Sequence, residues 1–244
     1  MKKLLFTGAL FLFLIFYSVK ISLPSVDAPI KIYSNHLRDD LRRITLKTLC
    51  QAKQSITIHT YALTDHKILN LLQKKAENGV TVDVFYHKKN KVPIKKPLKG
   101  NLCFHPISGK GLMHEKWIAI DEAVCLFGTA NLTPSSLSMH DNLLLGLHCP
   151  DLAKALRKGK SMDFKQVLGD QKFELFLLPH PKALSKILEA LESAKQRIAI
   201  ALFTFTHPDI VQKLIELRKR GVHIELYLDR YTAKGASSTA LKQL

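Results

Sequence analysis

The apolar residues of this chain fall into short runs with two different spacings, which alternate along the sequence. Over residues 35–54, apolar positions recur every three or four residues, the spacing of one helix face. Residues 55–61 form a short β-branched run instead, which favours a strand. A second helical pattern covers residues 64–78 and ends at a glycine, and residues 80–86 again favour a strand. The predicted order is helix, strand, helix, strand.

Short apolar strands that alternate with helices predict an α/β fold. Strands joined through a helix run parallel, so we expect a largely parallel sheet with helices covering its faces. The sequence has 244 residues, of which 46% are hydrophobic and 23% charged, a globular composition. This length allows one large domain or two small ones.

Two further β-prone runs lie close together at residues 117–120 and 123–127, on either side of Asp121 and Glu122. Their apolar residues alternate, and the separation is short. This pattern predicts a β-hairpin whose turn contains the two acidic residues.

Four polar side chains are expected at one end of that hairpin. Side chains alternate on a strand, so His114 and Lys116 share a face at the start of the first strand. Thr129 and Asn131 share a face where the second strand ends. An imidazole, an ammonium, a hydroxyl and an amide together suit a phosphate ester, because they supply a nucleophile or base, a cation and two neutral donors.

The same residues carry the pattern H-x-K-x(4)-D followed by G-[ST]-x-N. It is complete here as His114, Lys116, Asp121, Gly128, Thr129 and Asn131. At these positions the chain resembles the phospholipase D superfamily, although H-x-K alone would be weak. The resemblance implies a phospholipase D-like α/β/α sandwich. It also implies hydrolysis or transfer at a phosphodiester through a phosphohistidine, with no metal and no cofactor. The alternative is a surface hairpin with an ordinary His and Lys at its edge.

The resemblance implies a role for each motif residue. His114 would attack phosphorus or protonate the leaving oxygen, and Lys116 would hold the non-bridging oxygens. Thr129 and Asn131 would add donors to the bound substrate. Asp121 belongs to the catalytic motif, but at the hairpin turn we expect it to fix local geometry, or to be a plain turn residue, rather than to touch substrate.

One position departs from the family pattern. Members often carry a glutamate after the second box that orients the catalytic imidazole, and here Asn142 takes that place, beside Asp141. An amide cannot stabilise an imidazolium as a carboxylate does, so the orienting role is in doubt. Five other histidines lack motif context and are expected to be structural: His59, His66, His87, His105 and His140. Of these, His140 follows the second box closely and could line the pocket.

The helix and strand pattern recurs without a gap at an offset of 142 residues. Thirteen positions correspond, from Leu46 with Leu188 to Val84 with Leu226. Two unrelated units would not keep this register, so the recurrence indicates a duplication. We predict a phospholipase D-like domain with the complete motif over residues 30–150 and a second copy, truncated before its motif, over 172–244.

The offset also predicts where a second motif belongs. Adding 142 to 114 gives position 256, which lies beyond Leu244. In the resembled family, two H-x-K-x(4)-D hairpins meet across a pseudo-twofold axis and build one active site. Three interpretations stay open: a second motif in a missing C-terminal half, a second motif from another chain, or lost activity.

The amino terminus combines Met1-Lys2-Lys3 with an apolar run over residues 4–17. This is the pattern of an export signal, and it is short for a membrane span, which needs about 17–25 residues. We predict an N-terminal signal or membrane anchor over residues 1–23, and hence an exported or membrane-associated protein. A buried amino-terminal helix is the alternative.

The formal net charge of +17 predicts attraction to polyanions: nucleic acid, an anionic membrane surface or a phosphorylated substrate. Residues 87–100 concentrate this charge, with six lysines, two prolines and a glycine in a predicted loop. The loop suits lipid headgroups or a nucleic-acid backbone, and a merely solvated loop is equally compatible.

The four cysteines, Cys50, Cys103, Cys125 and Cys149, do not have the spacing of a zinc site, so no metal is predicted. Cys125 is expected in the core, and in an exported chain some of the others could pair.

The favoured function is hydrolysis or transfer at a phospholipid phosphodiester. An endonuclease of the same superfamily is the alternative, and a catalytically dead remnant that binds anions or membranes is a third.

Overall fold

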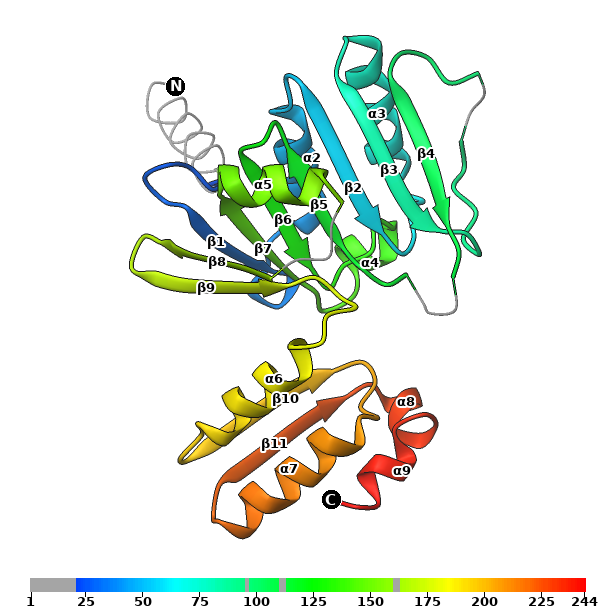
Figure 1. Cartoon of the computed structure of the whole chain (residues 1–244). Coiled ribbons are helices and arrows are strands. Elements are labelled where there is room, and N and C mark those ends of the chain that lie inside the picture. Colours follow the sequence, from blue (N-terminus) through cyan, green and yellow to red (C-terminus); the bar gives the residue numbers. More distant parts are fainter. Residues whose placement is uncertain (1–20, 95–96, 110–112, 160–162) are drawn as a thin grey trace, which may run out of the picture. The chain divides into compact units, whose positions relative to one another are not determined.

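The computed structural model describes residues 21–94, 97–109, 113–159 and 163–244 (Figure 1). The chain divides into two compact units. The first comprises residues 1–160 and 165–173, and the second comprises residues 161–164 and 174–244.

The first unit is built on one seven-stranded sheet. Its strand order is β1-β7-β6-β5-β2-β3-β4, so β4 and β1 lie at the two edges. The elements that lead to this sheet and cover it are β1 (Ile30–Ser34), η1 (Asn35–Leu37), α2 (Leu41–Cys50), β2 (Ser55–Thr60), α3 (His66–Glu77), β3 (Thr81–His87), β4 (Leu102–Ile107), β5 (Trp117–Ile120), β6 (Val124–Gly128), α4 (Pro134–Ser138), β7 (Leu143–His148) and α5 (Pro150–Arg157). Two more strands, β8 (Asp163–Leu168) and β9 (Gln171–Phe176), pair with each other.

The α/β prediction is confirmed, but the prediction of a largely parallel sheet is wrong. Within the seven-stranded sheet, β2 with β3 and β3 with β4 pair in parallel, and the other four pairings are antiparallel. The physical reason is that β5, β6 and β7 follow one another without a crossover helix that covers the sheet, and such strands pair antiparallel. The predicted hairpin of β5 and β6 is confirmed to within one residue.

The core of this unit lies between α2, α3 and one face of the sheet. Alternate residues of β2 and β3, such as Ile56, Ile58 and Val84, pack against Leu41 of α2 and Leu72 of α3, and all five are fully buried. On the opposite face α5 contacts β5 and β6. The helices therefore cover both faces of the sheet, as the α/β/α expectation requires.

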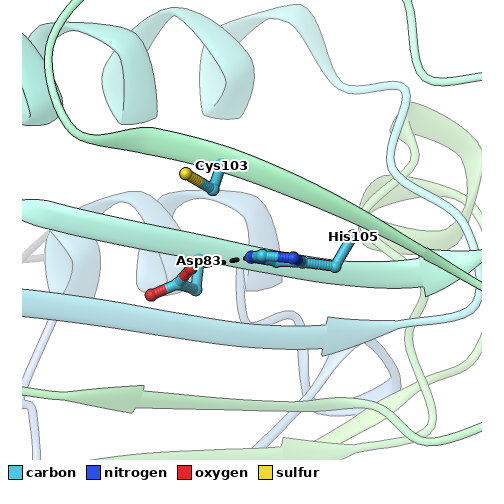
Figure 2. Close-up of side chains that lie close together, drawn as sticks. All are labelled: Asp83, Cys103 and His105. Carbon is cyan, nitrogen blue, oxygen red and sulfur yellow. Dashed lines mark hydrogen bonds and ion pairs between the residues drawn. The ribbon is translucent and has the colours of Figure 1, made fainter.

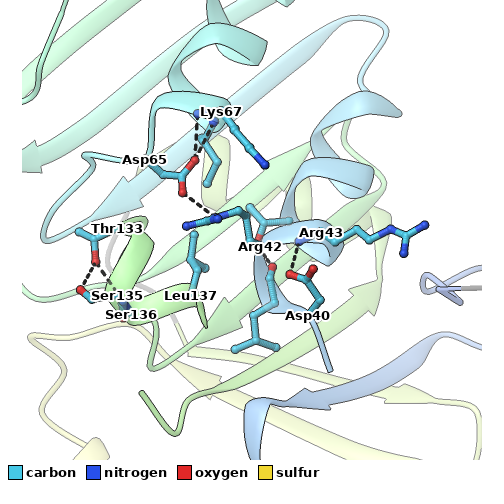
Figure 3. Close-up of polar contacts among 12 residues, drawn as sticks. Asp40, Arg42, Arg43, Asp65, Lys67, Thr133, Ser135, Ser136 and Leu137 are labelled. Carbon is cyan, nitrogen blue, oxygen red and sulfur yellow. Dashed lines mark hydrogen bonds and ion pairs between the residues drawn. The ribbon is translucent and has the colours of Figure 1, made fainter. Parts of the chain in front are cut away.

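Short polar side chains determine where the helices begin (Figure 3). Asp40 accepts a hydrogen bond from the Arg43 N–H and caps α2, while Asp65 accepts from two N–H groups and caps α3. The predicted helix over residues 35–54 is wrong in extent because Arg38 adopts a left-handed conformation (φ 66°), which separates η1 from α2. The Arg42 guanidinium lies 2.8 Å from Asp65, so the first turn of α2 is linked to the cap of α3.

The hairpin turn is fixed to the start of β2 by a carboxylate. Asp121 and Glu122 both adopt left-handed backbone, with φ of 50° and 48°, in the turn between the paired residues Ile120 and Val124. The Asp121 carboxylate accepts hydrogen bonds from the backbone N–H groups of Lys53, Gln54 and Ser55. The expectation that Asp121 fixes local geometry is thereby confirmed.

The second unit repeats the predicted order of elements. It contains α6 (Ala183–Glu192), β10 (Arg197–Leu202), α7 (Pro208–Lys219), β11 (His223–Leu228), α8 (Arg230–Lys234) and α9 (Ser238–Leu241). Strands β10 and β11 pair in parallel, with Arg197 opposite His223, whereas β2 and β3 pair with Ser55 opposite Thr81. Both pairs differ by 142, so the two units share not only their elements but also their strand register.

The predicted signal or anchor over residues 1–23 lies mostly outside the described residues. Ile21 and Leu23 pack against the core of the first unit. Within the described ranges, no helix has the length and apolar character needed to cross a membrane. All four cysteines are free, and Cys125 is buried in the sheet as expected.

We predict that Asp121→Asn destabilises the first unit by about 1–3 kcal/mol, because it removes the charge and turns an amide N–H₂ toward backbone donors. Asparagine tolerates the left-handed conformation, so the turn itself is kept. Trp117 of β5 is the single tryptophan, and its fluorescence during urea unfolding measures the change. The matched control Glu122→Gln should cost less than about 1 kcal/mol, since Glu122 makes only exposed ion pairs. Equal midpoints for wild type and Asp121→Asn would contradict this role.

Candidate active site

The structure brings the two motif boxes side by side at one end of the β5–β6 hairpin. The last residues of the strand pairing are Trp117 and Phe127. The Gly128 N–H then donates to the Lys116 carbonyl oxygen at 3.1 Å, which extends the pairing by one residue. His114 and Lys116 lie in the extended segment just before β5, rather than on the strand itself. The H-x-K segment therefore runs beside the G-T-x-N box.

Gly128 is required by the close approach of β7. A Cβ atom at this position would lie 2.3 Å from the backbone oxygen of Leu143 and 2.5 Å from Cδ2 of Leu144. The strand cannot shift without breaking its pairing on both sides. This explains the glycine of the second box as a packing requirement.

Tyr61 is the shared neighbour of the motif residues. Its ring centroid lies 5.3 Å from that of His114 in an edge arrangement and 5.2 Å from that of His87. Lys116 Nζ lies 5.9 Å from the same centroid and donates to the His114 carbonyl oxygen at 2.9 Å. Tyr61 follows β2 and His87 ends β3, so the parallel pairing of these strands brings both residues to this edge. Sequence reasoning missed them, although the predicted βαβ unit contained the signal.

Burial lowers the pKa of both motif side chains, His114 and Lys116. It lowers the pKa of His114 below 6.5, and the nearby Lys116 cation lowers that pKa further. Burial also lowers the pKa of Lys116 to about 8. At neutral pH the site therefore holds an uncharged imidazole, able to act as a nucleophile, beside an ammonium that is largely protonated.

The second box is held by Asn142. The Thr129 hydroxyl donates to Asn142 Oδ1 at 2.7 Å and accepts from the Leu143 N–H at 3.0 Å. The Asn142 amide in turn donates to the Ser136 carbonyl oxygen at 2.8 Å. Asn142 therefore positions Thr129 and α4, and the hydroxyl hydrogen of Thr129 is already used within the protein. The expected donation from Thr129 to a substrate would require this hydrogen bond to break.

Asn131 has unused hydrogen-bonding capacity. Its backbone N–H donates to the Ser136 hydroxyl at 2.9 Å. Its side-chain oxygen is buried and has no partner among the described residues. A buried acceptor without a partner costs about 1–3 kcal/mol, which suggests a place for a bound molecule.

Glu115 lies between the two motif residues in the sequence, and its carboxylate holds this segment in place. It accepts hydrogen bonds from His59 Nδ1 at 3.0 Å and Trp117 Nε1 at 2.9 Å. Burial acts to raise the pKa of Glu115, but these hydrogen bonds and the charge of His59 hold it below its usual value. His59 also stacks on Trp117 at 4.1 Å. This network fixes the extended segment that carries His114 and Lys116.

Two of the other predicted residues lie beside this group: His87 contacts Tyr61, and His59 contacts Glu115. Asp121 is at the opposite end of β5, so it does not join His114 in the described structure. His140 is exposed after α4, and His66 begins α3. His59, His87 and His105 all have ring neighbours within the sheet. Among the described residues, the one group of His, Cys, Asp and Glu side chains close enough to hold a metal does not include the motif residues.

Comparisons with known proteins agree on one family. The family model described as cardiolipin synthase, PLD-like domain, matches residues 45–162 and 187–244. Cardiolipin synthase B of Salmonella typhimurium is 29% identical over 136 residues, covering 49% of this chain and 31% of the relative. Cardiolipin synthase 1 of Bacillus anthracis is 26% identical over 135 residues, covering 51% of this chain and 26% of the relative. These matches span less than a third of the relatives' lengths.

Two solved structures match this chain to different extents. Polyphosphate kinase from Porphyromonas gingivalis matches 83% of this chain and 38% of its own, with a TM-score of 0.56 and 14% identity. Nuc from Salmonella typhimurium, a phospholipase D family member, matches 61% of this chain and 98% of its own, with a TM-score of 0.46 and 17% identity. The first match supports the α/β/α arrangement.

We predict that the Lys116 amine titrates with a midpoint near pH 8. An amine reacts with an acylating reagent only when unprotonated, so the acetylation rate of Lys116 should rise through pH 8 and then level off. Competitive acetylation between pH 6 and 11 with mass spectrometry of each lysine peptide measures this, and the other lysines serve as internal references. A rate that still rises steeply above pH 10 would show that burial leaves the amine unperturbed.

Proposed function

The chain belongs to the phospholipase D superfamily, and on that premise we propose that it is a phosphodiesterase of the phospholipase D type that acts on a phospholipid. One observation carries the proposal. The hairpin places the H-x-K segment against the G-T-x-N box, with a neutral imidazole beside a cation. This is the arrangement that nucleophilic attack on a phosphodiester needs.

The proposed reaction has two displacements. A ring nitrogen of His114 attacks phosphorus, a P–N bond forms, and the P–O bond to the leaving alcohol breaks. The leaving oxygen takes a proton from a general acid, for which the family uses the histidine of a second motif. Water, or an acceptor alcohol, then attacks phosphorus, the P–N bond breaks to release His114, and the former general acid, now a base, takes the proton of the attacking hydroxyl. Lys116 stabilises the charge that develops on the non-bridging oxygens.

Three features favour a lipid substrate. The curated relatives with the matches described above are named cardiolipin synthases. The lysine-rich segment over residues 87–100 suits an anionic membrane surface. The proposed signal or anchor over residues 1–23 would bring an exported or membrane-associated chain to its substrate. The net charge of +17 supports an endonuclease equally well, which makes this the alternative.

We predict that His114→Ala lowers phosphodiester turnover by at least about 100-fold in whichever complete, two-motif assembly is active, because it removes the nucleophile or the acid. The assay compares headgroup release from phosphatidylglycerol vesicles with cleavage of single-stranded DNA and RNA, both at physiological salt. Physiological rather than low salt is needed because a strongly basic protein binds nucleic acid without specificity when ions are dilute. The control His36→Ala changes an exposed histidine of η1 and should leave turnover unaltered.

The outcomes separate the three functions. Headgroup release that depends on His114 supports the lipid assignment. Nucleic-acid cleavage without headgroup release would assign the chain as an endonuclease. Vesicle binding with no cleavage of any substrate, in the presence of a second motif, would leave a catalytically dead protein that binds anions.

We further predict that residues 1–244 turn over substrate weakly as a monomer, because the sequence carries one H-x-K-x(4)-D motif and the family site combines two. Activity should appear when a polypeptide that supplies a second motif is added. If two copies of this chain build the site, specific activity should instead rise with protein concentration. Light scattering beside the turnover assay decides between these routes. A fully active species at monomer mass would show that one motif suffices.

A further inference from the structure

Three metal-ligating side chains of different chemistry meet on β3 and β4, away from the motif residues (Figure 2). The parallel register places Asp83 opposite Cys103 and Phe85 opposite His105. Cys103 and His105 are two residues apart, so they lie on the same face of β4. The ligand atoms of Asp83, Cys103 and His105 all lie within 4.8 Å of one another, and Asp83 Oδ1 is 2.7 Å from His105 Nε2.

We propose that Asp83, Cys103 and His105 bind a divalent transition metal ion, with zinc as the best match, and leave its fourth position to solvent. Zinc takes sulfur, nitrogen and oxygen ligands in tetrahedral geometry at about 2.0–2.3 Å. Donors at those bond lengths lie roughly 3.3–3.8 Å apart around the ion. Rotation of the Asp83 and Cys103 side chains would adjust the observed separations to this geometry, since all three residues stand on paired strands.

The charges of this cluster suit a divalent cation. A carboxylate and a thiolate together supply two negative charges, which neutralise the ion, while the imidazole binds as a neutral ligand. His105 is the described ion-pair partner of Asp83, and it balances the carboxylate only when it is protonated. In a chain with a net charge of +17, a cation needs such anionic ligands in order to bind at all.

The site is open to ions and its imidazole is held in place. The side chains of His105 and Asp83 are 41% and 36% exposed, and β4 is an edge strand of the sheet. The His105 ring stacks on Phe85 with a centroid distance of 4.4 Å and an interplanar angle of 17°. Phe85 in turn contacts His59 at 4.5 Å. A ring fixed by stacking loses little freedom when its nitrogen binds an ion.

Zinc at this position would link β3 to β4, the two strands on either side of the lysine-rich segment over residues 87–100. An ion that binds only the folded state stabilises it, and the effect grows with ion concentration. The expected consequence is a stability change rather than a change in chemistry, because neither His114 nor Lys116 contacts the cluster. The cysteine spacing along the sequence did not indicate a metal, since Asp83 is distant in sequence from Cys103 and His105 and only the register of β3 and β4 brings it to them.

The test uses the full-length chain, stripped with a chelator and then titrated with Co²⁺ and Zn²⁺. Cobalt bound by a thiolate absorbs in the near ultraviolet, so this band reports Cys103 directly. We expect one equivalent to produce the band, Zn²⁺ to displace it, and added Zn²⁺ to raise the melting temperature. Chelation should leave phosphodiester turnover unchanged, which separates this proposal from the proposed function.

Matched variants make the assignment specific. Mutation of a residue that only hydrogen-bonds a metal ligand weakens metal binding about 10–100-fold. Cys103→Ser removes a direct ligand, so it should weaken metal binding at least about 100-fold and abolish the band. Asp83→Asn should weaken binding as well. Cys50→Ser changes the other exposed free cysteine and should behave like wild type. In chelator all variants should melt together, which excludes misfolding as the cause. An absent band in the wild-type protein, or a band that survives Cys103→Ser, would overturn the proposal.

Discussion

The contact between the Asp121 carboxylate and three backbone N–H groups is the constraint on which the site depends. It holds the hairpin turn against the start of β2, where the chain leaves α2. With the turn fixed, β5 can pair with β2 in only one register, from Ile56 opposite Ile120 to His59 opposite Trp117. A slip of one residue would turn every side chain of β5 to the other face. The turn thus determines, at the far end of the strand, where His114 and Lys116 lie.

The same geometry gives the site its electrostatic character. Lys116 is half-buried beside the Tyr61 ring, and burial weakens its hold on a proton. An anion bound there would favour the charged ammonium and raise that pKa again, so substrate binding and protonation of Lys116 support each other. Burial, and after it the Lys116 cation, lowers the pKa of His114, so the imidazole stays neutral and can act as a nucleophile. One half-buried cation therefore serves both anion binding and the readiness of the imidazole.

Local patterns predicted those parts of the structure that local physics decides. The hairpin was correct because alternation and a two-residue acidic turn are both short-range signals, and α3 was correct because Asp65 and Gly79 bound it. The prediction of one helix over residues 35–54 was wrong at Arg38, where the backbone is left-handed although an arginine side chain gives no preference for that conformation. Tyr61 and His87 were missed for a different reason. They meet only because two parallel strands end at the same edge, and that depends on the pairing of the whole sheet.

The two units carry a carboxylate at the same position of the repeat, and its negative charge is balanced in different ways. Adding 142 to 83 places Glu225 of β11 at the position of Asp83. The Glu225 carboxylate is bound by the Arg197 guanidinium with an N–O distance of 2.7 Å, and this interaction lowers the pKa of Glu225 to about 2. Ser55 stands where Arg197 does in the other unit, so no guanidinium reaches Asp83 from there. The carboxylate of β3 instead faces His105 and lies close to the Cys103 thiol, and these three side chains form the proposed metal site. The same strand register thus supports an ion pair in one unit and a set of metal ligands in the other.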